Sequence, residues 1–218
     1  MKRFANVVPL LFIAFALSAA PITLRVDATG VASNVYHAHL TIPASPGPMT
    51  LFYPKWIPGE HGPTGPINGL AGLRIPANGQ AVTWLRDPVE MFAFNVDVPA
   101  GATSLDVDLD FIAPAPGANF TAGASTTPRL AVLSWNTVLL YPRGVASDSI
   151  QVDASLRIPA GWLYATALET RSRTGDEIHF EQATLTTVVD SPVQLGLTLR
   201  KIDLVSHSPL RHTLNLLS

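Results

Sequence analysis

Apolar and polar residues alternate along most of the chain after residue 21. The clearest case is the stretch 105–111, in which apolar residues occupy every second position and aspartates stand between them. Side chains of a β-strand point alternately to the two faces of a sheet, so this pattern predicts a strand with one buried face. Similar runs predict further strands at 22–26, 35–42, 49–53, 91–98, 130–135, 138–141, 150–158, 162–168, 178–180, 197–204 and 214–217.

Turn-forming residues separate these runs. Asn78 and Gly79 lie between short apolar runs at 73–75 and 81–84, and this pair favours a tight hairpin because both residues tolerate positive φ angles. Most of the 19 prolines and 15 glycines also fall between runs. No stretch has the apolar period of an ordinary amphipathic helix. We therefore predict an all-β domain, an antiparallel β-sandwich, over residues 21–218.

The first twenty residues follow a different pattern. Lys2 and Arg3 precede an apolar stretch at 4–17, and small residues follow at 18–20. This is the three-part pattern of a secretory signal peptide. The apolar stretch is shorter than the roughly 20 residues that span a bilayer. We expect residues 1–20 to direct export to the periplasm or the medium, and their removal to leave no stable membrane anchor.

Composition narrows the possible functions. The formal net charge is −2, only 14% of residues are charged, and no basic patch is visible, so nucleic acid is not an expected partner. The absence of cysteine excludes disulfides, thiolate zinc sites and cysteine nucleophiles. A surface of low charge also fits a domain that another domain or chain covers.

Histidine spacing gives little support for a metal site. A catalytic zinc site on a helix needs two histidines four residues apart, with a glutamate beside the first, and none of the six histidines has that spacing. His37 and His39 would share one face of a strand and could bind a metal together. The alternative is two half-exposed strand histidines, because no third ligand accompanies them.

Three aspartates at alternate positions resemble the start of a calcium-binding loop. Phe111 stands where that loop requires glycine, and Gly117 where it requires glutamate. We interpret Asp106, Asp108 and Asp110 as a solvated strand face whose charges discourage edge pairing.

The stretch 53–66 combines four prolines and three glycines with charged and aromatic residues. Neither a strand nor a helix tolerates this density, so the stretch predicts a rigid loop. Ordered loops often carry function. Trp56, Glu60 and His61 are the candidate residues for contact with a substrate or a neighbouring domain.

The sequence of this loop closely resembles the signature of the N-terminal domain of the glycyl aminopeptidase family. Members are exported bacterial zinc metallopeptidases of the gluzincin type that also carry a PDZ domain. Further similar segments cover nearly all of the mature chain, at 70–73, 84–88, 91–94, 98–101, 134–136, 140–142, 159–162, 165–168 and 189–192. The resemblance implies a β-sandwich that supports a zinc peptidase domain.

In that family the zinc ligands and the general base belong to a thermolysin-like domain that follows this one. The chain has no His-Glu-x-x-His sequence, so no catalytic residue can be carried over. We expect no cofactor in this chain and zinc in the catalytic domain. The implied partner is that peptidase domain, or a separate polypeptide that contains it. On this hypothesis the Glu60 carboxylate could receive the amino group of a substrate.

Three alternatives stay open at this point. The loop could be a structural plug in which Glu60 and His61 bond its own backbone. The chain could be a stand-alone exported domain that binds peptides or carbohydrates through Trp56, Trp84 and Trp135. An independent enzyme would require His37, His39 and His61 to converge on a metal.

Overall fold

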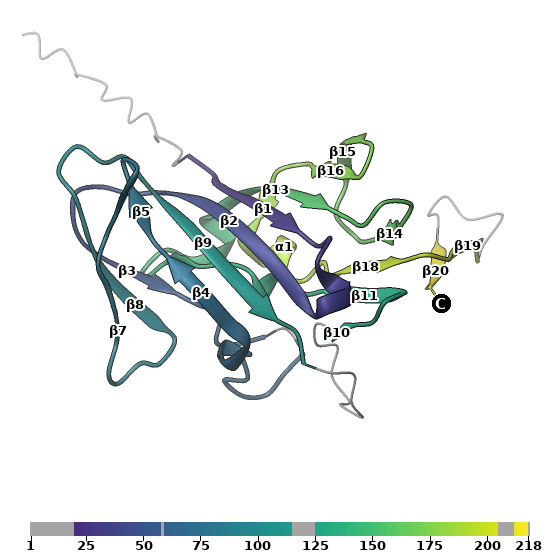
Figure 1. The fold of residues 1–218 in the computed structure, drawn as a ribbon, viewed down its shortest axis with the longest axis horizontal. Coiled ribbons are helices and arrows are strands. Elements are labelled where there is room, and N and C mark those ends of the chain that lie inside the picture. The colour runs from purple at the N-terminus through teal and green to yellow at the C-terminus, as the bar shows by residue number, and fades with distance from the viewer. Residues whose placement is uncertain (1–19, 58, 115–124, 205–211, 218) are drawn as a thin grey trace, which may run out of the picture.

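The computed structural model describes residues 20–57, 59–114, 125–204 and 212–217, so the predicted signal peptide lies outside it except for its last residue. The described chain is an all-β sandwich, as predicted (Figure 1). An eight-stranded sheet forms one layer, in the order β15-β16-β13-β1-β2-β9-β4, with β17 also paired to β13. Its strands are β1 (Ile22–Asp27), β2 (Val35–Pro43), β4 (Leu70–Arg74), β9 (Ser104–Ile112), β13 (Gln151–Arg157), β15 (Thr170–Thr174), β16 (Glu177–Phe180) and β17 (Ala183–Thr184).

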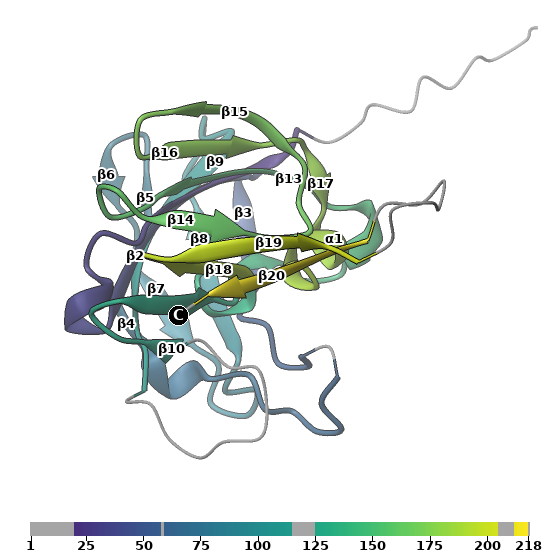
Figure 2. The same ribbon diagram turned by 90° about the vertical axis from the view of Figure 1, so that its right-hand side faces the viewer.

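Two four-stranded sheets lie across this layer (Figures 1 and 2). One has the order β12 (Tyr141–Pro142), β3 (Gly47–Phe52), β8 (Ala93–Val98), β7 (Trp84–Arg86), and the other β10 (Ser125–Thr126), β11 (Leu130–Leu133), β18 (Val193–Gly196), β14 (Leu163–Ala165). The described residues also form two separate strand pairs, namely β5 (Pro76–Ala77) with β6 (Gln80–Ala81), and β19 (Leu199–Asp203) with β20 (Thr213–Leu217).

Helical segments are short. They are the 3₁₀ turns η1 (Val31–Ser33), η2 (Ile67–Gly69), η3 (Trp135–Thr137) and η4 (Ser147–Ser149), and the helix α1 (Leu185–Val189). The Thr184 hydroxyl caps α1 by accepting a hydrogen bond from the Thr187 amide at 3.1 Å. Within the described residues, no helix has the length and apolar character needed to cross a membrane.

One continuous apolar core joins the layers. The predicted inward residues of β9 are all buried, which confirms the alternation inferred for this strand. The Tyr36 side chain of β2 reaches from the large sheet to a small one. Its hydroxyl donates a hydrogen bond to the Val132 carbonyl of β11 at 3.0 Å. Burial raises the pKa of the Tyr36 phenol far above its ordinary value, so this group stays a neutral donor.

Strand pairing differs from the predictions in two respects. The strands β1 and β13 pair in parallel, from Ile22 opposite Val152 onward, so the sandwich is not wholly antiparallel. The strand β9 lies between β2 and β4 and is not an edge. The prediction that its aspartates discourage edge pairing is therefore wrong. These side chains instead bond to polar groups across the β2–β9 pair.

Local predictions were more accurate for turns than for strand ends. Asn78 and Gly79 adopt φ angles of 50° and 73° and connect β5 to β6, which confirms the hairpin. The run predicted at 138–141 is a strand only from Tyr141, because the chain forms the turn η3 just before it.

Candidate functional site

The proline-rich loop, residues 53–66, is anchored at both ends; Pro58 lies outside the described residues. Tyr53 is fully buried, and its hydroxyl donates to the Thr137 carbonyl at 3.0 Å while its amide donates to the Phe92 carbonyl at 2.9 Å. The Gly65 amide donates to the Lys55 carbonyl at 3.0 Å and draws the far end of the loop back to its start. The loop is therefore a closed, fixed unit, as its composition predicts.

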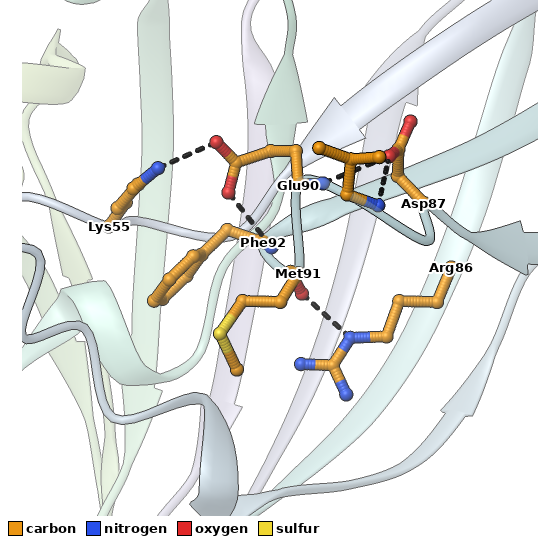
Figure 3. A network of polar contacts seen from close by, with 7 residues as sticks. Lys55, Arg86, Asp87, Glu90, Met91 and Phe92 are labelled. Carbon is orange, nitrogen blue, oxygen red and sulfur yellow. Dashed lines mark hydrogen bonds and ion pairs between the residues drawn. The ribbon is translucent and has the colours of Figure 1, made fainter.

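A second element, the β7–β8 turn at residues 87–92, lies against this loop (Figure 3). The Asp87 carboxylate accepts hydrogen bonds from the amides of Val89 and Glu90, each at 2.9 Å. At the other side of the turn, Arg86 Nε donates to the Met91 carbonyl at 2.7 Å. Aspartate commonly stabilises turns by bonding backbone two residues on, and here it fixes the direction of the whole turn.

An ion pair joins the loop to the turn. Lys55 Nζ donates to Glu90 Oε2 at 2.6 Å, and the ammonium also lies 5.6 Å from the centre of the Phe92 ring (Figure 3). The Phe92 amide in turn donates to Glu90 Oε1 at 3.3 Å. We call the loop and the turn, joined in this way, the platform.

The platform should weaken at acid pH. Hydrogen bonds from the Glu90 and Val89 amides lower the pKa of Asp87, and the hydrogen bond from Lys55 lowers the pKa of Glu90. A carboxyl with a lowered folded pKa stabilises the fold above its unfolded pKa, and that contribution is lost as the pH falls through the folded value. Urea midpoints should fall from about pH 5 downward, and less steeply for Asp87→Asn and Glu90→Gln. Equal slopes in wild type and both variants would contradict this account.

Apolar side chains project from the platform into solvent. Trp56 is 65% exposed, Val89 93% and Met91 51%. Beside Trp56 lies a mainly apolar hollow of about 260 Å³, which Leu185 and Val189 of the α1 helix also line. Exposed apolar groups on a rigid support are typical of an interaction surface.

Glu60 and His61 lie on the same loop, Glu60 partly buried and His61 exposed. The Glu60 amide donates to the Ile57 carbonyl at 3.0 Å, closing a turn. Among the described residues, neither side chain has a hydrogen-bond partner. The structural-plug alternative expected these side chains to bond the backbone of the loop, and among the described residues only the Glu60 main chain does so.

The histidines of β2 form two separate pairs with β9. His37 Nδ1 lies 2.6 Å from Asp110 Oδ1, and His39 Nδ1 lies 2.7 Å from Asp108 Oδ1. No group of three histidine or carboxylate side chains suited to a metal occurs within the described ranges, so His61 does not join them there. Within those ranges, neither pair has the third ligand that a zinc site needs.

The tryptophans proposed as a binding surface lie in different environments. Trp135 is fully buried, with its indole nitrogen donating to the Ser191 carbonyl at 2.9 Å, so its proposed role as a ligand platform is wrong. Trp84 is half-buried against Phe94. The β7–β8 turn was missed as a site, although the Asp87-Pro88 pair is a turn signal.

Comparison with known proteins identifies the family. Residues 23–197 match the family described as the peptidase M61 N-terminal domain. The chain matches no curated protein. An aminopeptidase N family protein from Idiomarina loihiensis is similar in structure, with a TM-score of 0.74 and 16% identity over 90% of this chain and 32% of that one. An M1 zinc metallopeptidase from Deinococcus radiodurans has a TM-score of 0.48 and 13% identity, over 91% of this chain and 46% of that one.

These comparisons differ in what they show. At 16% identity, the Idiomarina structure shows the fold alone, and this chain spans 32% of its length. The family match extends over most of the chain, from the second residue of β1 to the residue after β18. The chain belongs to the peptidase M61 N-terminal domain family.

Proposed function

We propose that this domain is a non-catalytic module that packs against a zinc peptidase domain of an exported metallo-aminopeptidase and shapes the substrate end of its cleft. The observation that carries the proposal is the platform, on which a fixed loop and turn expose Trp56, Val89 and Met91. The zinc and the catalytic residues belong to the partner domain in this proposal. The complex would act in the periplasm or the medium, on peptides with N-terminal glycine or alanine.

The physical properties of the platform suit such a contact. Tryptophan contributes strongly to interfaces because it buries a large, rigid surface. A loop that is already fixed loses little conformational entropy when it binds. The Lys55–Glu90 pair and the buried Tyr53 supply that fixation here.

Glu60 gives the proposal a chemical role at the cleft. Its carboxylate has no hydrogen-bond partner among the described residues, and a substrate ammonium group would supply one. Charge-assisted hydrogen bonds of this kind are short and comparatively strong. His61, which is exposed on the same loop, is a second candidate for substrate or interdomain contact.

The test is complementation with a separately produced peptidase domain from a family member that contains His-Glu-x-x-His. We expect the two pieces to co-elute and to release p-nitroaniline from glycine and alanine p-nitroanilides. Trp56→Ala should weaken the complex at least about tenfold, as truncation of a central tryptophan does. Leu163→Ala, which truncates an apolar side chain that is 38% exposed on β14, is the matched control. Glu60→Gln should raise KM for both substrates.

Two results would contradict this function. One is a failure of the pieces to associate or to hydrolyse either substrate. The other is an equal loss of affinity in Trp56→Ala and Leu163→Ala, which would mean that no particular surface is used.

A stand-alone binding domain is the second candidate function. Its binding site would not include the buried Trp135, but the half-buried Trp84 lines an apolar groove at a different place from the Trp56 hollow. That groove suits an extended peptide, because the end strands of two sheets border it.

A further inference from the structure

A groove runs between two unpaired strand edges. The strand β4 ends the eight-stranded sheet and β7 ends one of the four-stranded sheets, on the left side of Figure 1. Residues of both strands line a single hollow of about 440 Å³. Within the described part of the chain, no further strand pairs with either edge. The β7 edge is regular and presents backbone amides and carbonyls that a bound strand could pair with, whereas β4 is irregular between Ala71 and Arg74.

The floor of this groove is apolar and firmly supported. Trp84 packs edge-to-face on Phe94, with the ring centres 5.5 Å apart and an angle of 73° between the planes. The opposite wall is formed by Leu70 and Leu73 of β4, which are partly buried against the core. These groups would bury apolar side chains of a ligand without first having to become ordered.

An arginine stands toward each end of the groove. The strand β4 runs into the β5–β6 hairpin and β7 runs out of it, so Arg74 lies at the hairpin end and Arg86 at the other. Arg86 alternates with Leu85 and so shares the inward face of β7 with Trp84. Its Nε is held by the Met91 carbonyl at 2.7 Å, which leaves its terminal nitrogens to donate elsewhere. Neither arginine forms an ion pair with a carboxylate of the described residues.

We propose that this groove binds an extended polypeptide segment with an apolar centre and a carboxylate toward each end, as an added β-strand. The free edges recognise an extended backbone, and the wall and floor receive inward side chains at every second position. The two guanidinium groups recognise the carboxylates, for which their forked donors are suited. This inference rests on the groove and does not depend on the proposed peptidase partner.

Fluorescence anisotropy with the full chain tests the proposal. The probe is a fluorescein-labelled seven-residue peptide with glutamate at both ends, valine and isoleucine at the inward positions between them, and threonine elsewhere. We expect saturable binding, and about tenfold weaker binding after Arg74→Gln or Arg86→Gln, because hydrogen bonds to charged groups are worth this much. Arg171→Gln is the control, since Arg171 lies on β15 at the opposite edge of the same sheet. It should leave binding unchanged.

Two altered probes separate the components of recognition. Lysine in place of both glutamates should abolish measurable binding, because it sets like charges against the arginines. Methylation of alternate backbone amides, which removes donors without altering side chains, should weaken binding at least about tenfold if the backbone pairs with an edge.

Several results would overturn the proposal. One is that the first probe does not bind. Another is that either altered probe binds as tightly as the first. A third is that Arg171→Gln weakens binding as much as Arg74→Gln and Arg86→Gln do. Concentration-dependent self-association that the probe does not disrupt would also overturn it, by showing that a second copy fills the groove. Because Arg74 and Arg86 are exposed, their variants should fold, which circular dichroism verifies. Complementation with the peptidase domain is measured separately, so either idea can fail alone.

Discussion

Replacing Trp135 with alanine should lower the free energy of unfolding by about 3–5 kcal/mol, the usual cost of truncating a buried aromatic side chain to alanine. The side chain is fully buried, and its ring packs edge-to-face on Phe180 with centres 5.8 Å apart. Phe180 lies on β16 of the large sheet, whereas Trp135 follows β11 of a small one. The substitution would therefore open a cavity between the two layers. Urea unfolding followed by circular dichroism measures the loss.

Trp135→Phe separates packing from hydrogen bonding. It keeps a ring against Phe180 but removes the indole donor to the Ser191 carbonyl. That carbonyl also accepts from the Thr166 hydroxyl at 3.2 Å, so it would not be left without a partner. We expect a loss of about 1–2 kcal/mol, well below that of the alanine variant. Equal losses in the two variants would show that the cavity is not the main cause.

Alternation of apolar residues predicted the strands that have one buried face. The strand β9 is the best example, because the period of its side chains follows directly from the geometry of the chain. The strand β15 was missed because all five of its residues, including Arg171 and Arg173, are exposed. An edge strand without a buried face leaves no periodic signal. The parallel pairing of β1 with β13 joins segments about 130 residues apart, and no local pattern encodes such a choice.

The candidate site was predicted in part. Proline and glycine density indicated a fixed loop, and the loop is held at both ends by Tyr53 and Gly65. Its attachment to the β7–β8 turn was not predicted, because Lys55 and Glu90 are distant in sequence and neither residue type is unusual at a surface. The sequence could not show which of Trp56 and Trp135 is exposed, because both are tryptophans. Only the packing of the sheets exposes one and buries the other.

Gly65 determines whether the platform can form. A Cβ atom at this position would lie 2.0 Å from the Pro54 carbonyl oxygen and 3.0 Å from a ring carbon of Phe92. Backbone and a buried ring cannot yield as an exposed side chain can, so Gly65→Ala must displace the loop from the turn. We expect a loss of about 3 kcal/mol of unfolding free energy, at the upper end for overpacking. Chemical denaturation measures it, and binding of the peptidase domain should weaken in parallel.

Gly62→Ala is the control within the same loop. Neither glycine has a positive φ angle, and a Cβ at Gly62 would meet only the Thr64 methyl, at an ordinary 3.8 Å. Both substitutions reduce the freedom of the unfolded chain equally, so their difference isolates the contact with Pro54 and Phe92. A small loss of unfolding free energy at Gly62 and a large loss at Gly65 would show that the platform requires the loop to keep one conformation. Similar effects at both positions would mean that the loop tolerates other shapes, and that the exposure of Trp56 does not depend on this contact.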